Sequence, residues 1–394
     1  MRFAVVAVGY NRPASMSRLL KSILNADYQG DTVDLVISLD KGARQAELVE
    51  IAEKIQWPYG EKIVRVFSER QGLRPHILQC GDLTKENYDA VAVLEDDLIV
   101  SRGFYAYCKQ MIAAYDTDDR IAGISLYKHR LNPGVRRPFE PEEGPHDVYF
   151  MQMAQSWGEC WTSRMWKGFK TWYDGFDGEI VADVSFPQYI SKWNQASWMK
   201  YFNKYIVEND LYYVYPYKSL TTNHTDVGEH SAIANNDFQV PLLSAPMEYR
   251  CCSLQDGIKY DIFLERVDLS ATLFSKYQGK VLLDLMGTRH CFDGADFLVS
   301  VQELPYKVVE QLQLRYRPAE MNICIPNPGK GIFVYDLHTS AKKPKSNTQV
   351  LNAYDIRGIK HARAFSYGVQ GMLSAIERKM KKAKGMVLKG RKKS

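Results

Sequence analysis

The first hundred residues alternate short apolar runs with segments of helical periodicity, and this alternation constrains the fold more than any other feature. The runs have the length of buried strands, and apolar side chains in the segments between them recur three or four positions apart. Continuous apolar strands separated by helices predict an α/β fold, with a mostly parallel sheet and helices on both faces. The four runs cover residues 3–8, 33–39, 63–67 and 90–94.

Polar side chains directly follow three of these runs. Arg12 follows the first run, Asp40 follows the second, and the acids Glu95, Asp96 and Asp97 follow the fourth. Open parallel sheets bind their ligands beyond the carboxyl ends of the strands. We therefore expect these side chains to line one binding edge.

The acid triplet is the strongest chemical signal. Three adjacent carboxylates repel one another, and a divalent cation such as Mg²⁺ or Mn²⁺ would neutralise them in a cleft. The alternative is an exposed acidic turn. Asp40 has the chemistry to contact a nucleobase or ribose, or to cap a helix beside Gly42. Arg12 suits a diphosphate, or a surface ion pair.

Positive charge is concentrated at the C-terminus. Residues 378–394 hold nine Lys or Arg and no acid, whereas the rest of the chain holds 42 basic and 46 acidic residues. The body lacks the basic surface of a nucleic-acid enzyme, so we expect no specific nucleic-acid partner. Apolar residues recur between the lysines from Met372 to Lys393. This pattern predicts a basic amphipathic helix on an anionic membrane surface, and the alternative is a solvated tail.

Cysteine usage and hydropathy predict a cellular location. The seven cysteines are odd in number and contain no CxxC pair, which favours reduced thiols. The run at residues 3–8 is too short for a signal-peptide core, and no apolar window has the length of a membrane span. We expect a soluble cytoplasmic protein, with peripheral attachment at the inner face of the membrane through its tail.

The composition changes along the rest of the chain. Six of the seven tryptophans lie between Trp157 and Trp198. They predict a large aromatic core or a cleft with aromatic walls that holds a sugar ring, and the two are compatible. From about Leu254 onward, short strand-like runs without a chemical motif predict a smaller α+β region.

The ordered set of motifs resembles the GT-A glycosyltransferases, most closely the N-acetylglucosaminyltransferase I type and its bacterial relatives in surface-polysaccharide synthesis. The resemblance spans roughly residues 3–235. It implies a GT-A domain over residues 1–250. The change in composition predicts an accessory region over 251–365, and the charge pattern predicts the basic tail over 366–394. The motifs that carry the resemblance lie at residues 4–12, 37–42, 72–78, 93–98, 157–166, 197–198 and 215–220.

The resemblance also implies roles for particular residues. Asp97 would ligate the metal, Mn²⁺ or Mg²⁺. His230 would close the metal site from the C-terminal side, and the alternative is a structural histidine. Asp96 would face the ribose or diphosphate, Asp40 the base, and Arg12 the base or phosphate. The implied nucleotide-sugar-binding residues are Arg12, Asp40, Arg74, Glu95 and Asp96.

The sequence departs from this family at the catalytic base. The eukaryotic relatives place an Asp directly before a Trp-Met pair, but Ser197 precedes Trp198 here. The candidate bases are therefore Glu159 and Asp183, and for both the alternative is an ordinary surface acid.

Together these features predict a metal-dependent, inverting glycosyltransferase. It would move a sugar from a nucleotide-sugar donor, UDP-linked by resemblance, to a hydroxyl of a surface glycan or lipid-linked acceptor. One alternative is a sugar nucleotidyltransferase, which would normally carry a glycine-rich loop in place of residues 9–12. Another is a non-catalytic glycan-binding or scaffold protein. The missing Asp supports this alternative, and the intact acid triplet opposes it.

Overall fold

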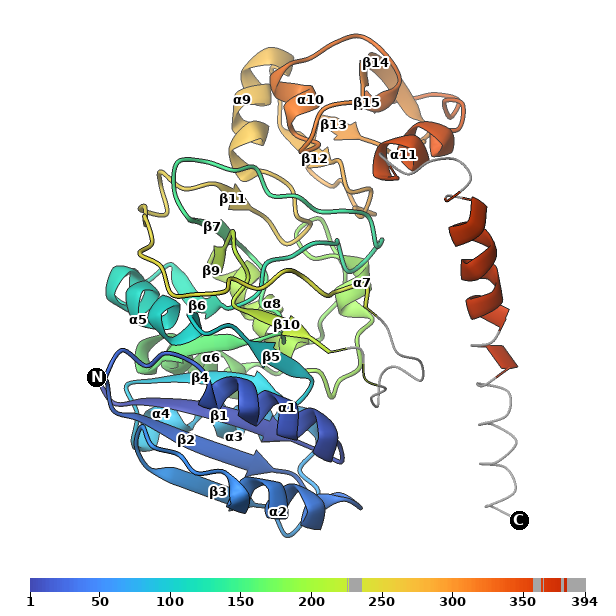
Figure 1. The fold of residues 1–394 in the computed structure, drawn as a ribbon. Helices are drawn as coiled ribbons and strands as arrows, with labels where there is room; N and C mark the ends of the chain where they lie inside the picture. The colour runs from blue at the N-terminus through green and yellow to red at the C-terminus, as the bar shows by residue number, and fades with distance from the viewer. Residues whose placement is uncertain (225, 227–235, 357–362, 364, 377–378, 381–394) are drawn as a thin grey trace.

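A computed structural model describes residues 1–224, 226, 236–356, 363, 365–376 and 379–380 (Figure 1). Its large sheet consists of β1 (Phe3–Gly9), β2 (Val33–Leu39), β3 (Lys62–Val66), β4 (Ala90–Glu95), β6 (Ile121–Ser125), β7 (Val148–Met151), β8 (Glu159–Thr162), β9 (Tyr212–Pro216) and β11 (Lys259–Tyr260). The remaining strands are β5 (Leu98–Val100) and β10 (Thr221–Asn223), which pair with each other, and β12 (Val281–Asp284), β13 (Phe297–Ser300), β14 (Tyr306–Gln313) and β15 (Gly331–Ser340). The helices are α1 (Pro13–Leu24), α2 (Gln45–Lys54), α3 (Leu73–Gly81), α4 (Leu83–Glu86), α5 (Phe104–Tyr115), α6 (Ser163–Gly175), α7 (Gln188–Ser191), α8 (Trp198–Glu208), α9 (Val267–Tyr277), α10 (Met321–Cys324) and α11 (Thr348–Asp355).

The large sheet is mixed but mostly parallel. Its strand order is β11-β7-β9-β6-β8-β4-β1-β2-β3. The block β4-β1-β2-β3 is entirely parallel, whereas β8 runs antiparallel between β4 and β6. The parallel block places the carboxyl ends of four strands at one edge, as the sequence predicts.

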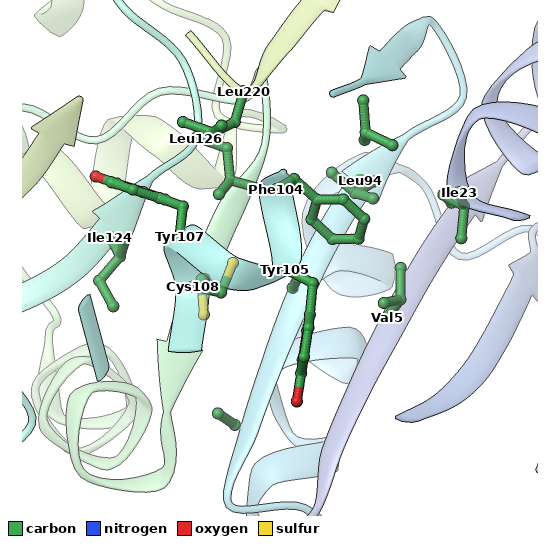
Figure 2. Packing of buried hydrophobic residues seen from close by; sticks show 14 of the residues in the cluster. Val5, Ile23, Leu94, Phe104, Tyr105, Tyr107, Cys108, Ile124, Leu126 and Leu220 are labelled. Atoms are coloured by element: carbon green, nitrogen blue, oxygen red, sulfur yellow. The ribbon is translucent and has the colours of Figure 1, made fainter. Parts of the chain in front are cut away.

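Both faces of the sheet are covered because side chains alternate along each strand. Val5 and Leu94 project to the face covered by α1, α2 and α5, where Phe104 and Tyr105 pack against them (Figure 2). Val6 projects to the opposite face, which α3, α4, α6 and α8 cover. These helices lie on the two sides of the sheet in Figure 1.

The tryptophan-rich segment forms an aromatic core on the second face. The ring of Trp161 is fully buried, and its centroid lies 4.9 Å from that of Trp166 and 5.5 Å from that of Trp198. The indole N–H of Trp161 donates to the hydroxyl of Tyr213 at 2.6 Å. The prediction of a large aromatic core is therefore confirmed.

The C-terminal region forms its own four-stranded sheet, in the order β12-β13-β15-β14. The helices α9, α10 and α11 contribute to an apolar core with it. The large sheet takes its last strand from Lys259–Tyr260, and the small sheet begins at Val281. The domain border at residue 250 remains a prediction. Among the described helices, none combines the length and hydrophobicity that crossing a membrane requires.

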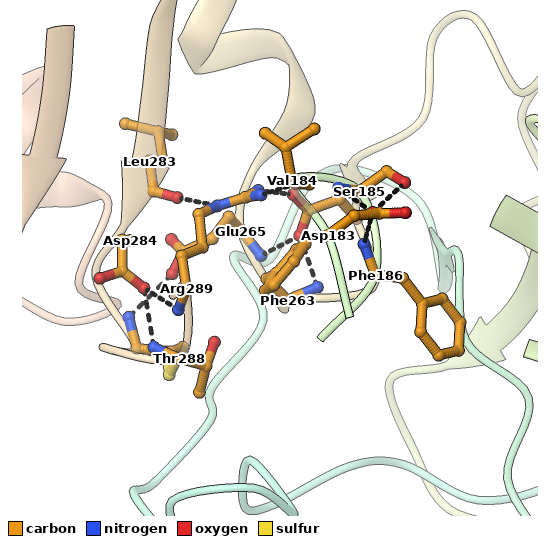
Figure 3. A network of polar contacts seen from close by, with 12 residues as sticks. Asp183, Val184, Ser185, Phe186, Phe263, Glu265, Leu283, Asp284, Thr288 and Arg289 are labelled. Atoms are coloured by element: carbon orange, nitrogen blue, oxygen red, sulfur yellow. Dashed lines mark hydrogen bonds and ion pairs between the residues drawn. The ribbon is translucent and has the colours of Figure 1, made fainter. Parts of the chain in front are cut away.

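A buried polar network joins the C-terminal region to the loop after α6 (Figure 3). Arg289 forms an ion pair with Asp261 and donates to the carbonyl of Val184 at 3.0 Å. Its guanidinium also lies 3.8 Å from the ring centroid of Phe263. These contacts fix the small sheet against the rest of the chain.

Burial of Glu320 in the C-terminal region predicts a pH-dependent stability. Burial raises the pKa of Glu320 from 4.5 to about 7. Because the folded state retains this proton longer than the unfolded state, Glu320 lowers the free energy of unfolding as pH rises from about 4.5 to 7. We expect Glu320→Gln to be more stable than the wild type at pH 8 by about 3 kcal/mol, and to lose this advantage near pH 4. Denaturant unfolding across this pH range measures the difference, and a difference independent of pH would contradict the prediction.

Candidate functional site

The candidate site lies where the polar residues after β1, β2, β3 and β4 meet. The register pairs Val8 of β1 with Glu95 of β4, and Gly9 of β1 with Leu39 of β2. This pairing brings Arg12 and the acid triplet to adjacent strand ends, as the sequence predicts.

The acid triplet ends β4 and turns the chain into β5. Glu95 is the last residue of β4, and Asp96 and Asp97 form the turn. Asp96 is 3% exposed, and its carboxylate accepts the backbone N–H of Tyr10 at 3.1 Å. The carboxylate of Asp97 is partly exposed. The triplet therefore offers one buried and one accessible aspartate.

Arg12 closes over both aspartates. Its guanidinium forms an ion pair with Asp96 and lies 3.3 Å from a carboxylate oxygen of Asp97. The backbone of Asn11 reaches this position through a left-handed turn, with φ of +54°. The side-chain oxygen of Asn11 accepts the backbone N–H of Arg44 at 3.0 Å, and a Cβ at Gly42 would lie 2.2 Å from that oxygen. Gly42 thus leaves room for the turn that directs Arg12 onto the acids.

The electrostatics of this cluster follow from its burial. Burial raises the pKa of Asp96 to about 6, although the charge of Arg12 lowers it. Burial and the charge of Asp97 raise the pKa of Glu95 to about 8. Burial would lower the pKa of Arg12, but Asp96 and Asp97 outweigh it and raise that pKa. A guanidinium therefore supplies part of the positive charge that the sequence argument assigned to a metal.

Of the two predicted metal ligands, one lies among the described residues. Asp97 provides a hard, accessible carboxylate of the kind that Mg²⁺ and Mn²⁺ prefer. His230 lies outside the described residues. Within the described part of the chain, no three His, Cys, Asp or Glu side chains converge as a ligand set. The described residues thus include one side chain, Asp97, that suits the proposed metal.

Asp40 holds the loop after β3 through backbone hydrogen bonds. It is 3% exposed and accepts the N–H groups of Gln71 at 2.7 Å and Gly72 at 3.0 Å. It does not cap α2, which begins without a side-chain cap. The helix-cap alternative for Asp40 is therefore wrong. Contact between Asp40 and a base remains a prediction.

Arg74, another predicted nucleotide-sugar contact, lies in the first turn of α3. Its guanidinium stacks on the ring of Tyr201 in α8, 4.7 Å from the centroid. This contact links α3 to the helix that begins at Trp198. A donor-binding role for Arg74 remains a prediction.

The two candidate bases occupy different environments. Glu159 begins β8 next to β4, is 2% exposed, and burial raises its pKa well above the usual range. Burial therefore disfavours its charged form, and the side chain is sealed from solvent. Asp183 lies in the loop between α6 and α7, where it accepts the N–H groups of Ser185 and Phe186 at 2.7 and 2.8 Å. Figure 3 shows Asp183 beside the Arg289 network. The catalytic role of each residue remains a prediction.

Sequence reasoning missed two residues beside the triplet. β10 pairs with β5, and the backbone N–H of His224 donates to the carbonyl of Asp97 at 2.6 Å. The ring Nδ1 of His224 lies 3.1 Å from Asp226, whose carboxylate also pairs with Arg18 of α1. The polar run at residues 222–226 was the available signal, but the sequence analysis gave it no role at the triplet.

No protein-family model matches the sequence, and no curated protein is significantly similar to it. TarS from S. aureus, residues 1–349, is 12% identical over 56% of this chain and 60% of its own, with a TM-score of 0.36. Its complex with UDP-GlcNAc gives 13% identity over 58% and 60%, with a TM-score of 0.39. Mannosyltransferase PcManGT from Pyrobaculum calidifontis, in complex with GDP-Man and Mn²⁺, gives 16% identity over 41% and 44%, with a TM-score of 0.30.

PcManGT is named a mannosyltransferase, and TarS was solved with UDP-GlcNAc bound. This chain spans 60% or less of the length of these structures.

Proposed function

We propose that this chain is a glycosyltransferase that moves a sugar from a nucleotide-sugar donor to a hydroxyl group. One observation carries the proposal: Arg12, Asp96 and Asp97 meet at the carboxyl ends of adjacent parallel strands, where such sheets bind ligands. A guanidinium and an accessible carboxylate at one edge suit a diphosphate and its counter-cation.

Each strand-end residue has a role in this proposal. Arg12 would exchange its ion pairs with the two aspartates for a contact with the donor diphosphate. Asp97 would hold Mn²⁺ or Mg²⁺, and the bound cation would offset charge on the departing diphosphate. Asp40 would keep the loop at Gln71 and Gly72 in place beside the nucleobase of the donor. A carboxylate would accept the proton of the acceptor hydroxyl, and direct displacement would invert the anomeric carbon.

The donor and acceptor belong to the same proposal. UDP-sugar is the proposed donor, and the acceptor is a surface glycan, as in bacterial polysaccharide synthesis, or a lipid-linked glycan at the inner face of a membrane. The basic tail would then meet the anionic surface of that membrane.

A scaffold function is the second candidate, and the placement of the candidate bases favours it. Ser197 precedes Trp198 at the start of α8, Glu159 is sealed in the core, and Asp183 lies by the C-terminal region. A protein without an accessible base would bind a donor or glycan without turnover. A nucleotidyltransferase is less well supported, because residues 9–12 fold onto the acids without a glycine-rich loop.

Calorimetric titration of UDP, with and without Mn²⁺, tests the donor site. We expect metal-dependent binding of UDP in the wild type and roughly a tenfold or greater loss of affinity in Asp97→Asn. Replacing a residue that only supports a metal ligand already lowers metal affinity by about that factor. The matched control is Asp210→Asn. Asp210 is exposed and precedes β9, which is parallel to β4, so it lies at the opposite edge of the sheet.

The outcomes separate the two candidate functions. Binding that Asp97→Asn abolishes, followed by donor hydrolysis, would support the transferase. Binding without any turnover would favour the scaffold. If GDP, CMP and TDP also fail to bind the wild type, the transferase proposal is wrong.

A further inference from the structure

The C-terminal helix carries an apolar stripe. Residues 365–376 and 379–380 are helical. Five large apolar side chains are each more than half exposed, and their spacing of 7, 1, 3 and 4 residues places them on one helical face. They are Phe365 (77%), Met372 (63%), Leu373 (62%), Ile376 (55%) and Met380 (56%).

This exposure distinguishes the helix from the others. In α1 and α8 the apolar residues are buried against the large sheet, as Leu19 and Phe202 illustrate. The C-terminal helix stands apart from both sheets in Figure 1. Contiguous exposed apolar side chains on a soluble protein mark an interaction surface.

The charge pattern indicates what covers the stripe. The sequence from residue 378 to 394 contains nine Lys or Arg and no acid, so the stripe continues into a strongly cationic segment. An apolar stripe beside clustered lysines is complementary to a bilayer that has an anionic surface and an apolar interior. A nucleic acid would satisfy the lysines but leave the apolar side chains in water.

The helix also contains residues that weaken it in water. Gly368 and Gly371 each cost roughly 1 kcal/mol of helix stability relative to Ala. A helix of this composition depends on a partner surface for its stability. The lipid interface provides such a surface because it buries the stripe.

We propose that the helix over residues 365–376 docks on an anionic phospholipid surface, with Phe365, Met372 and Ile376 inserted at the headgroup boundary. The lysines that follow provide the electrostatic attraction. This anchoring is independent of the reaction at the strand-end site, and it would hold that site close to substrates embedded in or attached to the membrane.

Vesicle flotation of the full-length chain tests the proposal. We expect the wild type to float with vesicles of phosphatidylcholine and phosphatidylglycerol at roughly two to one, and to remain behind with phosphatidylcholine alone. Met372→Gln/Ile376→Gln should reduce the bound fraction about tenfold, because two apolar anchors are lost. The matched control is Tyr367→Gln. Tyr367 is 56% exposed but projects from the opposite helical face, so its loss should leave binding unchanged.

Each alternative gives a distinct result. Equal binding of the stripe variant and the wild type would overturn the proposal. So would a wild type that stays behind with anionic vesicles but forms a stripe-dependent dimer in light scattering, which would identify a second copy as the occupant. Thermal unfolding should be the same for all three proteins, because the substituted side chains are each more than half exposed. UDP titration of the stripe variant separates loss of anchoring from loss of the donor site.

Discussion

Replacing Arg12 by methionine should lower the free energy of unfolding by about 2–4 kcal/mol. The change leaves the carboxylate of Asp96 buried without its guanidinium partner. The backbone N–H of Tyr10, at 3.1 Å, still donates to it. Breaking a buried ion pair from one side costs about 3–5 kcal/mol. We expect a somewhat smaller loss of stability for Arg12→Met because a quarter of the Arg12 side chain is exposed. Denaturant unfolding at neutral pH measures the loss.

The pH dependence and a matched control sharpen this test. Without Arg12, the pKa of Asp96 should rise above its wild-type value of about 6. The stability difference between Arg12→Met and wild type should therefore grow as pH rises above 6 and shrink below it. Adding Asp96→Asn should restore part of the loss. Arg44→Met, which breaks an exposed pair with Glu47, should lower the free energy of unfolding far less than Arg12→Met does. An equal cost for the two arginines would contradict the prediction.

Replacing Arg289 by methionine should destabilise the C-terminal region by about 3–5 kcal/mol. The side chain of Arg289 is 6% exposed, pairs with Asp261, and donates to the carbonyls of Leu283 at 2.7 Å and Val184 at 3.0 Å (Figure 3). Burial already raises the pKa of Asp261, and the charge of Arg289 opposes that rise. The variant loses a charge partner and two buried donors together.

Denaturant unfolding and limited proteolysis should both detect this loss of stability in Arg289→Met. Cleavage in the loop between α6 and α7 should become faster, because that loop loses its contact with the small sheet. Arg289→Lys should be intermediate, since it keeps the charge but not the planar donors. Arg120→Met is the surface control, and its exposed pair with Asp210 should contribute less than about 1 kcal/mol. Proteolysis at the wild-type rate in Arg289→Met would show that the network does not fix the loop.

Local patterns predicted the parallel block well. The runs at residues 3–8, 33–39 and 90–94 correspond to β1, β2 and β4 within one residue at either end. Buried strands and amphipathic helices carry their pattern within a few consecutive residues. The same reasoning missed the pairing of β8 between β4 and β6, because an antiparallel insertion depends on a partner strand about 70 residues away.

In the candidate site too, local sequence predicted some features and only the packing decided others. The sequence placed Arg12 and the acids at strand ends, but their ion pairs come from the left-handed turn at Asn11 and the space at Gly42. His224 meets Asp97 only through the pairing of β5 with β10. The candidate bases were chosen by residue type, and burial then separated Glu159 from Asp183.

The sequence by itself determined the α/β class, the acid triplet at a strand end, and the cationic tail, because each depends on neighbouring residues. The tertiary structure alone decided that Arg12 neutralises the aspartates, that Asp40 holds the loop after β3, and that Glu159 is sealed in the core. Hydrogen bonds and ion pairs between distant segments, and the burial that shifts their pKa values, depend on packing rather than on local order.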